Sequence, residues 1–417
     1  MQITCTLLKW SKEISAEKEL EEGNMFDAVI VDAVRTPLGR RKGSLAWTHP
    51  VDLLGGLLRK LVERNHLDAA AVDDVIVGCV DQVGEQGANV ARNAWLSAGL
   101  PESVPGVSLD RQCGSSLQAL HFAAQGIMSG AYDIAVAAGV ESMTRVPMFS
   151  TIAVHGTPMT QGLTERYQMH RWNREFFDQA LGAELIARQW GLSREDLDRF
   201  GLRSHQLASA AQQQGFFKQE IIPVSVRTSP DSEDWRLFSE DEGIRADTTL
   251  ARMSALPPAF SDLELITAGN ASQITDGASA TLVMRKEMAQ QLGLKPRARF
   301  VSFAVVGVDP VLMLTGPIPA TRKVLDRAGL RVSDIDLFEV NEAFASVVLA
   351  WQKEIGANWD KVNINGGAIA LGHPLGATGT RITATLLNAL ERRGGRYGLI
   401  AICEGGGMAN ATIIERI

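Results

Sequence analysis

The chain repeats one pattern of strand, turn and helix in its two halves. Residues 104–130 (VPGVSLDRQCGSSLQALHFAAQGIMSG) predict a strand, a tight turn, a helix of small residues and a terminating glycine. Residues 362–395 (VNINGGAIALGHPLGATGTRITATLLNALERRGG) predict the same succession. The segments 132–143 and 396–408 follow them as matching strands. Such a duplication predicts two related halves that face each other, with the residues for chemistry between them.

Strands alternate with helices along both halves. Residues 26–39 and 72–80 have the continuous apolar character of buried strands, and residues 51–67 have the apolar spacing of a helix. This alternation predicts a layered α/β fold built on a mainly parallel sheet. The 417 residues suffice for a sizeable core without disulfides.

The middle of the chain differs from both halves. Residues 145–266 are richer in Gln, Arg, His and aromatic side chains, and we expect an inserted lid domain that covers a substrate's tail; a plain packing subdomain is the alternative. The lid separates an N-terminal half at residues 25–144, completed by about 267–292, from a C-terminal half at residues 293–417. Residues 1–24 form an acidic N-terminal extension, either a true arm or the product of an upstream start.

The composition excludes several classes of protein. Lys and Arg number 41 against 48 Asp and Glu, a net charge of −7, which argues against a nucleic-acid binder with a basic face. No apolar run reaches the roughly 18 residues of a membrane span. The four cysteines include no CxxC spacing and indicate neither a disulfide framework nor a zinc ribbon. We therefore expect a cytoplasmic protein that binds neither nucleic acid nor membrane.

Two turns after predicted strands carry reactive side chains. Cys113, in DRQCGSSLQA, precedes a predicted helix whose free N–H groups and dipole favour the thiolate. A buried structural cysteine is the alternative to a nucleophile. His373, in NGGAIALGHPLGATG, occupies the equivalent turn of the second half. It could deprotonate a thiol or polarise a carbonyl, and a hydrogen-bonded structural histidine is the alternative.

Two further residues follow predicted strands of the second half. Cys403, in AICEGGGM, has a thiol whose reference pKa of ~8.5 suits acid–base chemistry. The glycines from Gly405 onward expose N–H groups of the kind that form an oxyanion hole; a strand cysteine before a glycine turn is the alternative. Asn341, in EVNEAFA, could hold a water or an oxyanion, or could cap a helix. Active sites of α/β proteins lie at the carboxyl ends of strands, where these residues are expected to gather.

Five motifs in this order resemble the thiolase family: DRQCGSSLQA, AGNASQITDGA, NEAFAS, GGAIALGHPLGATG and CEGGGM. The resemblance extends from about Asp27 to the C-terminus. It implies a duplicated five-layer α/β/α/β/α fold with an inserted lid, and acyl transfer from coenzyme A (CoA) thioesters. It also implies CoA as a substrate, no metal, no permanently bound cofactor, and a homodimer or homotetramer.

The resemblance implies a role for each matching residue. Cys113 is the nucleophile that accepts the acyl group, and His373 is the base that activates it and helps to hold the thioester oxygen. Cys403 is the acid and base at the acetyl methyl carbon. Asn341 holds a water in one oxyanion hole, and the N–H groups of Cys113 and Gly405 form the other.

Substrate contacts follow from the same resemblance. Ser272 matches a lid-edge residue near the CoA pantetheine, and Met313 and Phe344 match residues that line the acyl pocket. Because CoA carries phosphates, basic lid residues are candidate contacts, with a solvated face as the alternative; they are Arg166, Arg171 and Arg174.

The implied reaction is thiolysis of a 3-ketoacyl-CoA through an acyl-enzyme on Cys113, with ping-pong kinetics. A biosynthetic acetyl-CoA acetyltransferase with the same chemistry is the main alternative. A non-catalytic acyl-CoA-binding protein would be expected to lack one of the three reactive residues, all of which are present. The second thiol, Cys403, argues against a ketosynthase, and the GHP and CEGGG motifs argue against a cysteine hydrolase.

The chain departs from the family pattern at several positions. Glu404 stands where many thiolases have an apolar residue, and we expect its side chain to be solvated. Gln273 and the lid segment YQMHRWNREFFDQALG differ from short-chain biosynthetic thiolases. Both favour a degradative enzyme for long or bulky acyl chains, a steroid side chain among them. Three lid aromatics could face such a chain or belong to the core: Trp172, Phe176 and Phe177.

Overall fold

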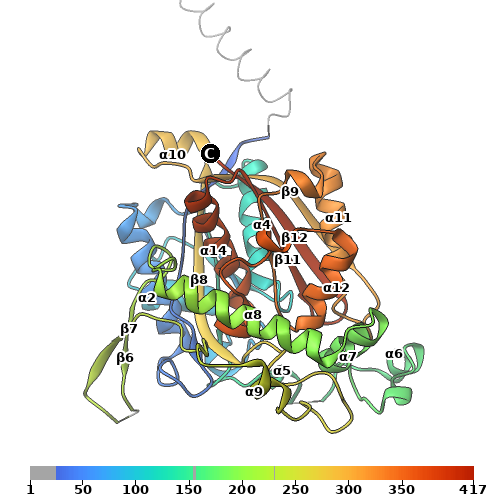
Figure 1. Cartoon of the computed structure of the whole chain (residues 1–417). Coiled ribbons are helices and arrows are strands. Elements are labelled where there is room, and N and C mark those ends of the chain that lie inside the picture. The colour runs from blue at the N-terminus through green and yellow to red at the C-terminus, as the bar shows by residue number, and fades with distance from the viewer. Residues whose placement is uncertain (1–24, 154–155, 230) are drawn as a thin grey trace, which may run out of the picture.

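The computed structural model describes residues 25–153, 156–229 and 231–417, so the predicted extension at residues 1–24 lies outside the described part. A ten-stranded sheet dominates this part of the chain (Figure 1). Its strands are β1 (Ala28–Arg35), β2 (Gly39–Arg40), β3 (Asp74–Gly78), β4 (Gly106–Leu109), β5 (Ile134–Ser142), β8 (Thr275–Arg285), β9 (Ala298–Gly307), β10 (Leu337–Val340), β11 (Tyr397–Glu404) and β12 (Met408–Arg416). They lie in the order β10-β11-β12-β9-β1-β8-β5-β3-β4, and β2 pairs with β8.

Each half of the sheet repeats one arrangement. β4, β3, β5, β8 and β1 lie side by side in the N-terminal half, and β10, β11, β12 and β9 repeat the last four of these. A parallel bridge between Phe338 of β10 and Val362 occupies the place of β4 in the second half. The predicted internal duplication is therefore visible in the strand order.

The prediction of a mainly parallel sheet is wrong. Three of the nine strand pairs described in this sheet are parallel: β3 with β4, β3 with β5, and β10 with β11. β12 returns from β11 through a turn of three glycines, and so short a connection forces antiparallel pairing. Gly406 and Gly407 in this turn have φ values of 76° and 78°, which glycine adopts without strain. In the other half, β8 enters after the long middle segment and runs antiparallel to both β1 and β5.

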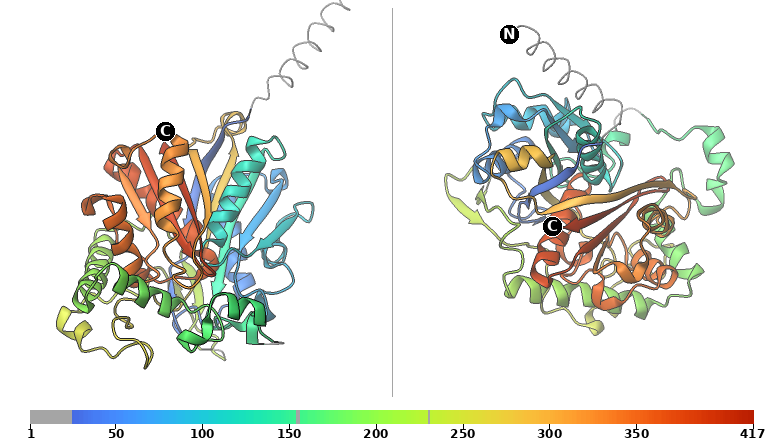
Figure 2. Two further views of the ribbon diagram at one scale, coloured as in Figure 1. Left: turned by 90° about the vertical axis from the view of Figure 1, so that its right-hand side faces the viewer. Right: turned by 90° about the horizontal axis from the view of Figure 1, so that it is seen from above.

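Helices form three layers around and between the two halves of the sheet (Figure 2). The outer layers are α2 (Pro50–Arg64) and α3 (Val90–Ser97) on the N-terminal half, and α11 (Pro317–Ala328) and α12 (Ala345–Ile355) on the C-terminal half. The middle layer consists of α4 (Ser115–Met128) and α14 (Thr378–Arg393), which contact each other and strands of both halves. Three large apolar clusters fill the spaces between the layers. The predicted α/β/α/β/α order is confirmed.

The middle layer is tightly packed. Every residue of α14 from Thr378 to Leu390 is buried. At Gly379 an added Cβ would lie 2.0 Å from the backbone nitrogen of Leu117 in α4. The two helices can therefore approach this closely only because position 379 has no side chain.

The segment between β5 and β8 lies across one end of the layers (Figure 1). Its elements are α5 (Ser150–Ala153), α6 (Gln161–Arg166), α7 (Gln179–Gln189), α8 (Arg194–Gln213), the hairpin of β6 (Val224–Arg227) and β7 (Trp235–Phe238), and α9 (Leu250–Ser254). The short helix α10 (Lys286–Gln291) follows β8. Within the described residues, every helix is too short or too polar to cross a bilayer.

Replacing Gly379 with Ala is expected to lower the free energy of unfolding by about 1–3 kcal/mol, because the added methyl group overpacks the contact between α4 and α14. Gly56→Ala in α2 is the matched control, since an added Cβ there meets nothing within 4 Å. That variant is expected to gain about 0.5–1 kcal/mol. Urea denaturation followed by circular dichroism measures both. A Gly379 variant as stable as the unmodified protein would contradict the close packing.

Candidate active site

Cys113 and His373 lie at matching turns of the two halves. Cys113 precedes α4, and His373 lies between α13 (Ala368–Leu371) and α14. Because α4 and α14 are in contact at Gly379 near their first turns, the two side chains are brought to the same region between the halves. Both residues are buried, with 6% of Cys113 and 4% of His373 exposed.

The hydrogen bonds of His373 define which ring nitrogen is the base. The Thr378 hydroxyl donates to the carbonyl of Pro374 at 2.9 Å, and its oxygen lies 2.6 Å from Nδ1 of His373. Since the hydroxyl hydrogen of Thr378 is used in the hydrogen bond to Pro374, Nδ1 carries the ring proton and donates a hydrogen bond to the Thr378 oxygen. Nε2 is then the unprotonated nitrogen, and the Asn341 amide Nδ2 lies 3.3 Å from it. His373 thus presents a basic Nε2 in the site.

Burial holds both groups neutral. It lowers the pKa of His373 to about 3, with a further contribution from the positive charge of Arg381. It raises the pKa of the Cys113 thiol to about 12, and the carboxylate of Glu404 adds to this effect. The N–H groups of Gly405 and Cys113 act in the opposite direction but do not outweigh burial. The N–H groups at the start of α4 therefore favour the thiolate, and burial acts more strongly against it.

Cys403 lies at the end of β11 and is fully buried. Burial raises the pKa of its thiol well above the ordinary value, and Cys113 is the largest charge-related cause of that shift. The two thiols therefore lie close enough for a charge on one to oppose a charge on the other. The N–H of Gly405, two residues along, lowers the pKa of Cys113 and so faces its sulfur. The N–H groups of Gly405 and Cys113 therefore both act on the Cys113 sulfur.

Asn341 directly follows β10 and has 2% of its surface exposed. Its backbone N–H donates to Ala401 in β11 at 3.0 Å. Its Oδ1 makes no hydrogen bond to any described residue, so one polar atom is free to face a ligand. The alternative of a helix cap is wrong, because α12 begins at Ala345 and its N-cap is Phe344.

The loop that carries Asn341 is fixed by the next residue. The buried Glu342 carboxylate accepts hydrogen bonds from the Ser204 hydroxyl at 2.6 Å, the Asn363 amide at 2.9 Å and the Ile369 N–H at 3.2 Å. These donors come from the middle segment and from the chain leading to His373. Glu342 therefore ties the Asn341 loop to the His373 loop.

Two adjoining cavities open onto these residues. One, of about 260 Å³, is lined by Cys113 and Gly405; the other, of about 300 Å³, is lined by His373. Residues that line both cavities are Met148, Phe149, Phe176, Gln179 and Leu375. The cavities therefore meet between Cys113 and His373, and their shared wall is mostly apolar.

Comparison with known protein families decides the identity of this fold and site. Residues 28–287 match the thiolase N-terminal domain, and residues 294–416 match the thiolase C-terminal domain. The chain belongs to the thiolase family. The resemblance seen in the five sequence motifs is confirmed, and the protein is an enzyme.

Individual relatives cover nearly the whole chain. A protein of Mycobacterium tuberculosis named steroid 3-ketoacyl-CoA thiolase FadA6 is 52% identical over 395 residues, which are 94% of this chain and 95% of the relative. A 3-ketoacyl-CoA thiolase of Bacillus subtilis is 44% identical over 400 residues, 94% of this chain and 100% of the relative. The crystal structure of the Bacillus anthracis acetyl-CoA acetyltransferase superimposes with a TM-score of 0.86 at 38% identity, covering 95% and 100% of the two chains.

The residues predicted for the pantetheine (Ser272) and for the acyl pocket (Met313 and Phe344) line the cavities. Ser272 and Phe344 line the cavity of His373, and Met313 lines the cavity of Cys113. The Ser272 N–H donates to the carbonyl of Ala343 at 2.9 Å, which fixes the AGNAS loop to the NEAF loop. Of the lid aromatics, Phe176 lines both cavities and Phe177 lines that of Cys113.

The three lid arginines do not line either cavity. Arg174 forms ion pairs with Asp178 and Asp262, both at 2.6 Å. The Arg166 guanidinium lies over the ring of Tyr167, 5.7 Å from its centre. Arg171 lies in the short 3₁₀ turn that follows α6.

A basic hollow that the sequence reasoning missed lies farther along the same segment. This hollow of about 200 Å³ is lined by His205, Arg245, Arg252 and Leu256, and by Gly269 of the AGNAS loop. Asp247 also lines it and forms an ion pair with Arg252 at 2.5 Å. No motif identifies it, because its two arginines are isolated in a stretch without regular spacing. Its only signal in the sequence is its position just before AGNAS.

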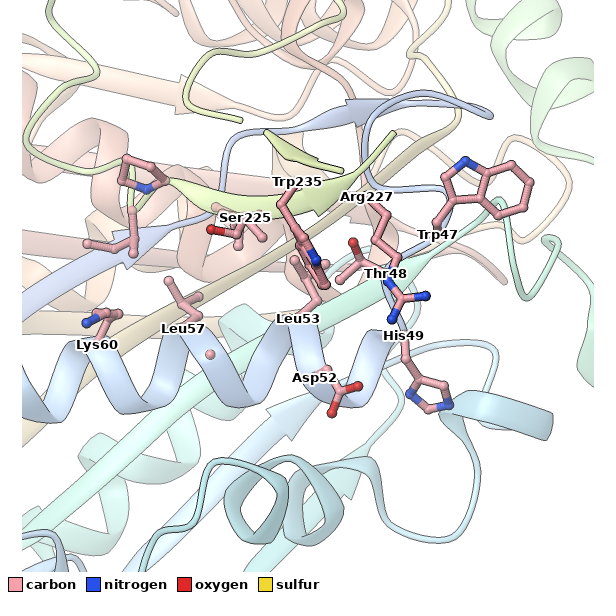
Figure 3. A pocket seen from close by; sticks show the side chains of 15 residues that line it. Trp47, Thr48, His49, Asp52, Leu53, Leu57, Lys60, Ser225, Arg227 and Trp235 are labelled. Atoms are coloured by element: carbon pink, nitrogen blue, oxygen red, sulfur yellow. The ribbon is translucent and has the colours of Figure 1, made fainter. Parts of the chain in front are cut away.

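A larger cavity, of about 470 Å³, lies between α2 and the β6–β7 hairpin (Figure 3). Its labelled walls include Trp47, Asp52 and Lys60 on the α2 side and Trp235 on the hairpin. It is lined by neither thiol nor His373, so it does not take part in the predicted chemistry.

The expectation of a solvated Glu404 is wrong. The residue is the last of β11 and is fully buried, with 0% of its surface exposed. Successive side chains of a strand point to opposite faces, so Glu404 points away from the face of Cys403 and towards the start of α4. The alternation of side chains along a strand shows which residues share a face of the sheet. It does not show whether that face is exposed to solvent or covered by a buried helix.

Replacing Thr378 with Val is expected to lower kcat/KM for thiolysis by roughly 10- to 100-fold, because Nδ1 of His373 loses its acceptor and the ring no longer holds Nε2 as the base. Thr383→Val is the control on the same helix, since its hydroxyl bonds only to the Gly379 carbonyl at 2.9 Å. Steady-state kinetics over a range of pH measures both variants. Equal losses in the two would show that the Thr378 hydroxyl has no specific role.

Proposed function

We propose that this thiolase cleaves 3-ketoacyl-CoA thioesters with CoA to give acetyl-CoA and a shortened acyl-CoA. The observation that carries this function is a pair of buried thiols, Cys113 and Cys403, that interact electrostatically, with the neutral His373 on the adjoining cavity. The relatives named 3-ketoacyl-CoA thiolase support it. One thiol serves as the nucleophile, and the other is available for proton transfer at carbon.

The first half-reaction forms the acyl-enzyme. The sulfur of Cys113 attacks the 3-keto carbon while its proton passes to Nε2 of His373. The C2–C3 bond then breaks, the carbonyl re-forms as a thioester on Cys113, and the electron pair remains on C2 as an enolate. Cys403 gives its proton to C2, which releases acetyl-CoA. The N–H groups around the sulfur of Cys113 stabilise developing negative charge, and loss of one such donor typically costs about 3–4 kcal/mol of barrier.

The second half-reaction returns the acyl group to CoA. The Cys403 thiolate takes the proton of an incoming CoA thiol, and the CoA sulfur attacks the thioester on Cys113. Cys113 leaves and recovers the proton that His373 holds. Both thiols and the imidazole end in their starting states, so CoA enters only as a substrate and no permanently bound cofactor or metal takes part.

The substrate is a long or bulky acyl chain, and residues 145–266 act as the lid that selects it. Support comes from the apolar wall contributed by Met148, Phe149 and Phe176 of this segment, which lines both cavities. The relative named as a steroid thiolase supports the same choice. The alternative, a biosynthetic acetyl-CoA acetyltransferase, is supported by the name of the similar solved structure.

The CoA phosphates occupy the basic hollow of Arg245 and Arg252. This hollow includes Gly269 and Leu256, while the His373 cavity includes Ser272 and Phe260. The same two chain segments therefore line both, and a pantetheine arm laid along them would join the acyl cavity to the hollow. Ser272 retains its predicted place near this arm. The earlier candidates among the lid arginines are the alternative phosphate contacts.

Assembly and location complete the proposal. The enzyme is a homodimer or homotetramer in the cytoplasm. The edge strand β4 supports a subunit contact, since Val107 on it is 43% exposed and Phe122 on the adjacent α4 is also 43% exposed.

Turnover of 3-ketoacyl-CoAs of increasing acyl size tests the proposed reaction. We expect kcat/KM for long-chain or steroid side-chain substrates to exceed that for acetoacetyl-CoA by at least about tenfold, as an extended apolar wall would give at ~0.8 kcal/mol per buried CH₂. Cys113→Ala should form no acyl-enzyme, and Cys403→Ala should still be acylated by a simple acyl-CoA but cleave no C–C bond. A preference for acetoacetyl-CoA would favour the acetyltransferase. Unimpaired thiolysis by Cys403→Ala would remove that residue from the mechanism.

Replacing Arg252 with Ala tests the phosphate site. The KM for CoA is expected to rise by roughly tenfold with little change in kcat, since a charge-assisted phosphate contact of about 1.5 kcal/mol is lost. Arg171→Ala is the matched comparison on the lid. A rise in KM for Arg171→Ala alone would place the phosphates at the lid arginines instead.

A further inference from the structure

Glu404 lies against the start of the helix that carries the nucleophile. An added Cβ at Gly114 would lie 1.9 Å from Oε1 of Glu404, so the carboxyl group packs directly on the backbone of Gly114. Gly114 follows Cys113 and is the N-cap of α4. Asn410 of β12 closes the other side, where its Nδ2 donates to the Gly114 carbonyl at 3.0 Å.

The carboxyl group is buried without hydrogen bonds. Both Oε1 and Oε2 of Glu404 have no hydrogen-bond partner among the described residues. Such a group costs several kcal/mol when it is charged, unless charges nearby compensate. Burial accordingly raises the pKa of Glu404 to about 8. A carboxyl group so placed changes its charge near neutral pH, whereas an ordinary glutamate does not.

The charged and titratable groups around Glu404 come from every element packed on it. Arg111, in the turn between β4 and α4, lowers its pKa, and Asp110 in the same turn raises it. Its own strand contributes Cys403, and α4 contributes the buried His121, whose pKa Arg111 also lowers. Cys113 is the remaining group, and Glu404 is the largest charge acting on it.

Glu404 and Cys113 compete for the same positive potential. The free N–H groups at the start of α4 favour a negative charge there. The carboxylate of Glu404 and the thiolate of Cys113 both lie at this end, and a charge on either opposes a charge on the other. The fold fixes the position of the carboxyl group. Its charge state therefore changes the electrostatic potential at the Cys113 thiol before substrate binds.

We propose that Glu404 is a positioning residue whose carboxylate, once ionised, adds to burial in opposing the Cys113 thiolate of the free enzyme. The nucleophile then reacts less readily with electrophiles until a substrate binds and His373 takes its proton. The proposal rests on the nucleophilic role given to Cys113 above. It does not require a particular acyl substrate.

Alkylation of Cys113 by iodoacetamide tests this role without using thiolysis. The rate is measured against pH for the unmodified enzyme and for Glu404→Gln, and the modified cysteine is located by peptide mass spectrometry. Above about pH 8 Glu404 is ionised, so the Gln variant is expected to be alkylated about tenfold faster than the unmodified enzyme. The midpoint of its rate–pH profile is expected about one pH unit lower. Below that pH the two rates should converge, because Glu404 is then neutral in the unmodified enzyme.

Two control variants separate charge from packing. Glu404→Asp keeps the charge and should restore the profile of the unmodified enzyme. Glu391→Gln removes a carboxylate that pairs with Arg297 at the end of α14, and should leave the profile unchanged. Identical profiles for Glu404→Gln and the unmodified enzyme would overturn the proposal. A shift of the same size in Glu391→Gln would overturn it as well, since general surface charge would then explain the effect.

A measurement on the unmodified enzyme covers the case in which Glu404→Gln does not fold. Burial also raises the pKa of Glu339 to about 8, so carboxyl ¹³C NMR of glutamate-labelled protein should show, among the groups that titrate near pH 8, one that shifts when Cys113 is alkylated. Absence of such a group would overturn the proposal. If thiolysis itself failed while the alkylation result held, the proposed function would be wrong and the coupling of Glu404 to Cys113 would stand.

Discussion

The contact between α4 and α14 is the constraint on which the active site depends. These helices fill the layer between the two halves of the sheet, and each begins beside a reactive residue, Cys113 on one and His373 on the other. Their close approach requires Gly379, where no side chain separates the backbones. Catalytic geometry in this thiolase is therefore set by the packing of the core. The positions of the loops at the helix ends follow from that packing.

Burial controls the charge of every reactive group. With pKa values of about 12 for Cys113 and about 3 for His373, the free site contains a neutral thiol and a neutral imidazole. A thiolate–imidazolium pair would lack the solvation needed to stabilise it. Proton transfer must then accompany attack on the substrate, and backbone N–H groups are the groups in place to receive the negative charge. Thr378 matters because a neutral imidazole is effective in one tautomer only.

The duplication is predicted correctly from local patterns of turns, glycines and apolar runs, and the layer order from the resemblance to the thiolase family. The direction of β8 and β12 could not be predicted in this way, since it depends on how the chain re-enters the sheet. The burial of Glu404 and the neutrality of Cys113 also escaped prediction. Both depend on which distant segments of the chain pack against the side chain. The residues next to it in the sequence do not indicate which segments these are.

α14 is buried on all sides from Thr378 to Leu390, with sheets of both halves and α4 around it. Neither half offers this helix a complete set of neighbours. The boundary between the two family domains near residue 290 thus separates two related sequence halves and does not separate independent folding units. A chain ending there would leave the inner face of α4 and the sheet behind it uncovered, an apolar surface prone to aggregation. Each half therefore depends on α14 for a complete core.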